Sequence, residues 1–153
     1  MSILDNLNQR LTIDDGEICV GGENEIEKII NIAPIILPDD YIEFLKNVSG
    51  LGNWGIVFSV DETGNMIYIW DAKMALQKYE EFFRDSTKEF LECAWLIGDD
   101  VGDLVYFYGE GNDGKGLYRT SSGELSFTYA EKIADSLTEF LTEGKGIDIA
   151  TTL

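Results

Sequence analysis

The sequence predicts an α+β fold in which a central, mainly antiparallel sheet is flanked by helices. Three observations support this prediction. Apolar residues recur with helical spacing before residue 50, then fall into short β-branched and aromatic runs separated by turn residues, and return to helical spacing near the end. The chain has 153 residues, 44% of them hydrophobic, which is enough for one core, and we expect residues 1–153 to form a single domain.

Two helices are expected ahead of the sheet. Glu23–Ala33 has apolar residues at the i, i+3, i+4 and i+7 positions of an amphipathic helix, and Pro34 ends it. A second helix is expected to have Pro38 as its first residue, with Asp39 and Asp40 in its first turn, where the helix dipole favours anions. The residues that these helices are predicted to bury are Ile26, Ile29, Ile30, Ala33, Tyr41, Phe44, Leu45 and Val48.

Strand-like runs begin at residue 56. Ile56–Val60 and Met66–Trp70 flank a turn and predict a hairpin, after which Asp71 can cap a helix. A helix from about residue 129 to residue 143 is expected to close the chain. Its predicted buried face consists of Ile133, Leu137, Phe140 and Leu141. The other expected elements are a short helix that begins at residues 86–89 and strands at Ala94–Ile97, Leu104–Tyr108, Gly116–Thr120 and Leu125–Thr128.

The charge balance favours binding over catalysis. Asp and Glu total 29, Lys and Arg total 11, and the net charge is −18. Such a surface repels nucleic acid, phosphate ligands and anionic membranes, and it attracts basic proteins. The sequence contains no histidine, which excludes histidine triads, imidazole metal sites and histidine proton shuttles. We therefore expect no enzyme activity and no cofactor. The alternative explanation of the acidity is that it only keeps the protein soluble.

The chain is expected to be cytoplasmic. Its first residues lack the basic and apolar regions of a secretory signal, and no apolar run approaches the ~20 residues needed to span a bilayer. The two cysteines, Cys19 and Cys93, are then expected to be free thiols in a reducing compartment. Two thiols without histidine do not make a closed zinc site, so we expect no metal there.

The glycine-rich stretch from Gly109 to Gly116 has the letters of a dinucleotide fingerprint and nearly those of a Walker A loop. Both nucleotide motifs must open a helix, whereas residues 117–120 resemble a strand. Glu110 and Asp113 would also repel the phosphates. We therefore predict a hairpin turn that binds neither ATP nor NAD.

Three carboxylates, those of Asp99, Asp100 and Asp103, crowd one turn between two predicted strands. They could bind Ca²⁺, but an EF-hand loop would need a ligand and a glycine at positions where Val101 and Leu104 stand. Asx-turn bonds, with glycines at positive φ, are the favoured explanation. Paired carboxylates could also hydrolyse a glycoside, the least favoured alternative.

From residue 89 to residue 131 there are nine acidic residues and two basic ones, interleaved with Trp95, Tyr106, Tyr108 and Tyr118. Acidic residues interleaved with aromatic residues are suited to an interface that binds a basic partner. The competing interpretation is that the aromatics form the core. Strand alternation sends Tyr106 and Tyr108 to one face of the sheet and Phe107 to the other, so about half of them are expected to be buried.

Several motifs together resemble the SUKH superfamily. They are Leu37–Leu45 followed by Ser49-Gly50, the strand end Ile69-Trp70, the turn Ile97–Asp100 with Gly102-Asp103, and the closing segment Ser136–Leu141. The resemblance extends from about Ile26 to Phe140. It implies an α+β fold and, in most members, an immunity protein that binds and neutralises a toxin, often a nuclease. A related yeast member is instead a regulatory hub.

The leading hypothesis is therefore an immunity protein that neutralises a cognate toxin with a basic surface. A regulatory adaptor without a toxin is the alternative, and a carboxylate-based hydrolase is a distant third. No nucleic acid or membrane is expected as a partner, and a homodimer stays open. The expected contact residues are Asp99, Asp100 and Asp103, with Asp39, Asp40 and Trp70 as weaker candidates. The alternative is that these residues are structural. Asp39 and Asp40 would then complement a helix dipole, and Asp99 would close its turn.

Overall fold

A seven-stranded sheet forms the centre of the computed structural model, which describes residues 6–15, 23–49, 55–84, 93–111, 114–121 and 130–150. Strands that follow each other along the chain lie side by side, and each neighbouring pair is antiparallel. The strands are β1 (Leu11–Asp15), β2 (Gly55–Val60), β3 (Met66–Trp70), β4 (Ala94–Asp99), β5 (Leu104–Gly111), β6 (Gly114–Ser121) and β7 (Glu131–Ala134). The predicted α+β fold with an antiparallel sheet is confirmed.

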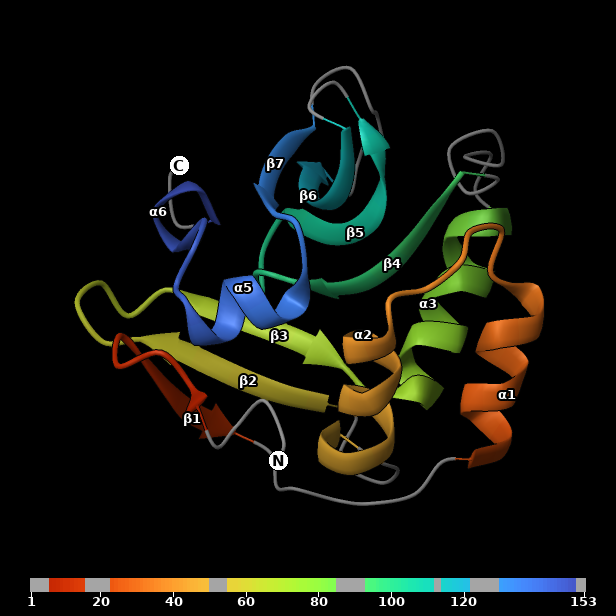
Figure 1. The fold of residues 1–153 in the computed structure, drawn as a ribbon, viewed down its shortest axis with the longest axis horizontal. Helices are drawn as coiled ribbons and strands as arrows, with labels where there is room; N and C mark the ends of the chain where they lie inside the picture. The colour runs from red at the N-terminus through yellow and green to blue at the C-terminus, as the bar shows by residue number, and fades with distance from the viewer. Residues whose placement is uncertain are drawn as a thin grey trace.

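The sheet curls around one short helix (Figure 1). The described helices are α1 (Glu23–Ile32), α2 (Asp39–Phe44) with its π-helical continuation η2 (Leu45–Ser49), α3 (Ala72–Arg84), α5 (Leu137–Thr142) and α6 (Ile147–Ala150). Helices α1 and α3 pack together at one end of the fold, whereas α5 lies between β1–β3 and β5–β7 (Figure 1). Helix α5 therefore lies inside the curl of the sheet.

The apolar faces of α2 and α5 form the core, as predicted. The six residues expected to hold these helices on the sheet are all buried: Tyr41, Phe44, Leu45, Leu137, Phe140 and Leu141. Helix α1 buries Ile26 and Ile29, but Ile30 is 53% exposed and not in the core as expected. Helix α1 packs on α3 and η2, so only a narrow stripe of its surface is covered.

The aromatic residues between the acidic ones belong to the core. Trp95, Tyr106, Tyr108 and Tyr118 are all at most 3% exposed, so the expectation that half of them face a partner is wrong. Trp95 Nε1 donates to Tyr41 Oη at 3.0 Å, and the Tyr106 ring packs edge-on against Phe140 of α5 at 6.0 Å. Both faces of β5 are covered, and for this reason alternation along the strand does not expose an aromatic side chain.

The glycine-rich stretch is a hairpin, as predicted. Strands β5 and β6 pair in register up to Gly111 and Gly114, and Gly114 has a φ of +89°. Gly116 lies within β6, where a Cβ atom would come within 2.7 Å of the Ala134 carbonyl oxygen. A strand, and not a helix, therefore follows the glycines.

The structure corrects the predicted closing helix. Residues 131–134 pair with β6 as β7, and the helix begins only at Leu137, because Ser136 caps it there. Pro38 is the N-cap of α2 and not its first helical residue. Strand β1 and helix α6 were not expected. The expected helix at residues 86–89 and strand at residues 125–128 lie outside the described residues.

Candidate partner-binding surface

The turn from Asp99 to Asp103, called the acidic turn below, is built by carboxylate-to-backbone bonds. Asp99 Oδ1 accepts from the Val101 N–H at 2.8 Å, and Asp100 Oδ1 accepts from the Leu104 N–H at 3.1 Å. These are the predicted Asx-type bonds. The positive φ of +62° falls on Val101, however, and not on a glycine as expected.

The three carboxylates of the acidic turn are not equivalent. Burial raises the pKa of Asp99, and the bonds from the Val101 N–H and the Trp70 indole oppose that rise. Asp103 is exposed and forms no hydrogen bond or ion pair with another described residue. Asp99 and Asp100 therefore hold the turn, while the carboxylate of Asp103 is available to a partner.

Trp70 does not belong to the surface. Its side chain is fully buried, and its Nε1 donates to Asp99 Oδ2 at 3.1 Å. The indole supports the acidic turn from below, so the expectation that Trp70 contacts a partner is corrected by its burial.

Asp39 and Asp40 begin α2 and have different surroundings. Asp39 is exposed and has no hydrogen-bond or ion-pair partner within the described part of the chain. Asp40 Oδ2 accepts from both the backbone N–H of Thr138, at 2.9 Å, and its hydroxyl, at 2.8 Å. Asp40 therefore caps α5, in addition to lying in the first turn of its own helix.

Helix α5 depends on such remote partners because its six residues are too few for a stable isolated helix. The Leu137 N–H donates to Tyr108 Oη at 2.9 Å, and the Glu139 N–H donates to Ser136 Oγ at 3.1 Å. At the other end, the Asn8 N–H donates to the Leu141 carbonyl oxygen at 2.7 Å. Bonds to Asp40, Tyr108 and Asn8, which belong to three other segments, thus satisfy the helix termini together with the adjacent Ser136.

Asp40→Ala should lower the free energy of unfolding by about 1–2 kcal/mol, because it leaves the Thr138 N–H without its cap. Asp40→Asn, which keeps an acceptor oxygen, should recover part of that loss. Asp39→Ala removes an equal charge without a bond and serves as the control. Urea denaturation measures all three, and equal stability of the Asp40→Ala and Asp39→Ala proteins would contradict the capping role.

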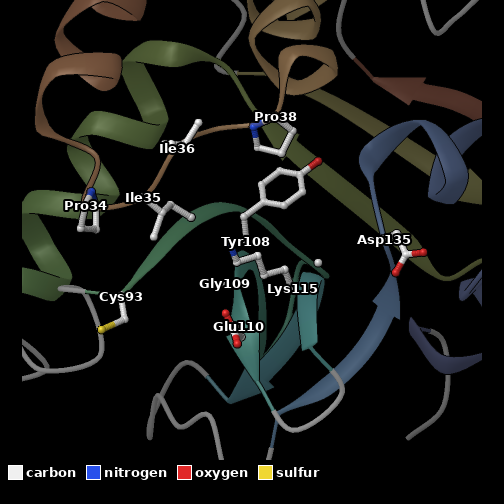
Figure 2. A pocket seen from close by; sticks show the side chains of 11 residues that line it. Pro34, Ile35, Ile36, Pro38, Cys93, Tyr108, Gly109, Glu110, Lys115 and Asp135 are labelled. Atoms are coloured by element: carbon white, nitrogen blue, oxygen red, sulfur yellow. The ribbon is translucent and has the colours of Figure 1, made fainter.

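A groove of about 890 Å³ opens between the α1–α2 loop and the β5–β6 hairpin (Figure 2). The loop contributes Pro34, Ile35, Ile36 and Pro38, and the hairpin contributes Glu110 and Lys115 with two glycines. This groove was not predicted from the sequence. One signal in the sequence could have indicated it. The apolar run Ile35–Leu37 lies between two prolines, which prevent a helix or a regular strand, so burial within such an element does not account for three large apolar residues there.

The predicted contact residues form two separate groups. Asp39 and Asp40 directly follow Pro38, which lines the groove. The acidic turn lies at the opposite end of β4 and β5, because Ala94 pairs with Gly109 beside the groove, whereas Asp99 pairs with Val105 beside the turn. The sequence neighbours in each group are brought together, but the two groups are not.

Two further findings concern the described residues only. They contain no group of three or more His, Cys, Asp or Glu side chains that could hold a metal ion. Among their helices, none has the length and apolar character needed to cross a membrane.

A comparison with protein families matches residues 22–143 to the SMI1/KNR4 family (SUKH-1). The matched range contains the acidic turn, both groove walls and all of α5, and it confirms the SUKH resemblance seen in the motifs. No curated protein matches the chain.

Proposed function

The chain belongs to the SMI1/KNR4 family (SUKH-1), and on this membership we propose that it is an immunity protein that binds and neutralises a cognate bacterial toxin. We take the toxin to be a nuclease, because the SUKH resemblance often implies that class. It also places the encounter in the cytoplasm, where a nuclease would reach the cell's own nucleic acid.

The charge of the chain supports this proposal. A nuclease needs a basic groove to hold the phosphate backbone, and a protein of net charge −18 is attracted to such a groove. Steering by opposite charge raises association rates, and occupation of the groove excludes the nucleic acid. Neutralisation then requires only binding and no catalysis by the immunity protein.

The proposed contact includes both groups of carboxylates. Asp103 and Asp39 are exposed, and neither forms a bond with another described residue, so their charges can meet a cation of the toxin. Asp99, Asp100 and Asp40 add negative charge beside them while their oxygens hold the backbone.

Expression of the toxin domain encoded beside this chain's gene, with and without the chain, tests the proposed function. The toxin alone should arrest growth, and co-expression of the chain should restore it. Growth arrest that persists despite abundant folded chain, or the absence of a toxin gene beside it, would favour the regulatory adaptor instead.

The double variant Asp100→Asn/Asp103→Asn should keep its thermal stability, because an asparagine oxygen can still accept from the Leu104 N–H. Its association with the toxin should slow roughly tenfold at low salt and by less at high salt, and protection should weaken. Glu23→Gln/Glu27→Gln, on the exposed face of α1, makes the same charge change away from the turn. Lost stability, or protection as strong as in this control, would remove the acidic turn from the contact.

A further inference from the structure

The α1–α2 loop presents one isoleucine to solvent. Ile36 is 98% exposed, whereas its neighbour Leu37 is buried and Ile35 packs partly against the core. Pro34 and Pro38 restrict the backbone on both sides, so Ile36 is held outward by a constrained segment. A side chain with almost no contact contributes nothing to the stability of the isolated chain.

Two further isoleucines that precede Ile36 in the sequence are also exposed. Ile30 and Ile32 of α1 are 53% and 43% exposed, so three of the large exposed apolar side chains fall within residues 30–36. The others among the described residues are dispersed over different elements. They are Ile13, Met66, Val101 and Ile149.

The groove beside Ile36 has a floor suited to an apolar side chain. Gly109 and Gly116 face each other across β5 and β6, and both line the groove with backbone atoms alone. The Tyr108 ring lies on the floor beside Pro38, with its hydroxyl committed to the Leu137 N–H (Figure 2).

Carboxylates outnumber ammonium groups around the groove. Glu110 lines it and is exposed, as is Asp135, which pairs with Lys132. Asp39 and Asp40 follow the Pro38 wall, and Lys115 is the cation among the lining residues. A second copy of the chain would bring its own charge of −18 and be repelled, whereas a basic segment would be attracted.

We propose that this groove, with Ile36 at its edge, binds a large apolar side chain of a partner protein that is flanked by lysines or arginines. This inference rests on the proposed function and specifies the toxin's contact: an apolar anchor within a basic surface. Buried anchors of this kind supply most of the energy at interfaces, while surrounding charges set the association rate.

Titration of the full-length ¹⁵N-labelled chain with a synthetic peptide tests the groove without a toxin. The probe is a capped nonapeptide with a Leu-Phe-Leu centre and three lysines at each end, for which we expect a Kd of roughly 0.1–1 mM. Amide shifts should appear at residues 35–37, 93, 109–110 and 115–116. Ile36→Asp should weaken binding roughly tenfold or more, whereas Ile149→Asp, the same change at another exposed site, should not.

Several outcomes would overturn the inference. They are shifts confined to the acidic turn, equal binding of a peptide with a serine centre, tighter binding of a peptide with glutamates in place of lysines, or a dimer in sedimentation that Ile36→Asp dissociates. Protection assays separate this inference from the proposed function. If wild type and Ile36→Asp protect equally against the toxin, the groove is not part of the toxin contact, whereas the proposed immunity function is retained. If the peptide binds the groove but no toxin is neutralised, the proposed immunity function is contradicted, whereas the groove is retained as a binding site.

Discussion

Phe140→Ala should destabilise the protein by about 3–5 kcal/mol. Phe140 is fully buried on α5, and its ring packs against Tyr106 of β5 at 6.0 Å. Truncation leaves a cavity where α5 packs against β5. Because domains of this size are stable by only about 5–15 kcal/mol, the variant should lose a large part of its stability.

Urea denaturation followed by circular dichroism measures this effect. Glu143→Ala, an exposed change at the end of the same helix, provides the control and should stay within about 0.5 kcal/mol of wild type. A loss below about 1 kcal/mol for Phe140→Ala would contradict the central position given to α5.

Raising the pH above 10 should unfold the protein cooperatively. Burial raises the pKa of Tyr41, Tyr106 and Tyr108 above the ordinary value of 10.0, and nearby carboxylates add to the rise in each case. The folded state therefore resists ionisation that the unfolded state permits. The stability associated with these groups is fully present below pH 10 and is lost as the pH rises from there towards the folded pKa values.

Each tyrosine lowers the free energy of unfolding by up to about 1.4 kcal/mol per pH unit in that range, and the three together by about 4 kcal/mol. Tyrosinate absorbance and circular dichroism should therefore change together. Tyr106→Phe removes one of the three ionisations from a hydroxyl that has no hydrogen-bond partner among the described residues, and it should make the slope shallower by about a third. Gradual ionisation near pH 10 in a protein that stays folded would contradict this prediction.

Elements with strong periodicity were predictable from the sequence. The spacing in α2, the hairpin of β2 and β3, and the cap that Asp71 places on α3 through its bond from the Met74 N–H all follow from local pattern. Strand β7 does not, because three of its four residues, Glu131, Lys132 and Ala134, are of types depleted in strands. Pairing with β6 fixes it, together with an ion pair from buried Arg119 to Glu131 at 2.7 Å.

The site was predictable only where its contacts are local. The bonds inside the acidic turn join residues two to four positions apart, and the sequence indicated them correctly. Asp40 caps α5 through Thr138, which is 98 positions away, so its role depends on the tertiary fold. The same is true of the burial of Trp70 and of the groove, whose walls come from distant segments.

Inhibition of the purified toxin by the purified chain tests the proposed function most directly. A candidate toxin domain from a gene beside that of the chain is titrated with the chain, and the rate of nucleic-acid cleavage is measured at low salt. The immunity proposal predicts a linear fall that reaches zero at an equimolar ratio, because a bound protein blocks the substrate groove. Cleavage at the full rate in the presence of excess folded chain would contradict it.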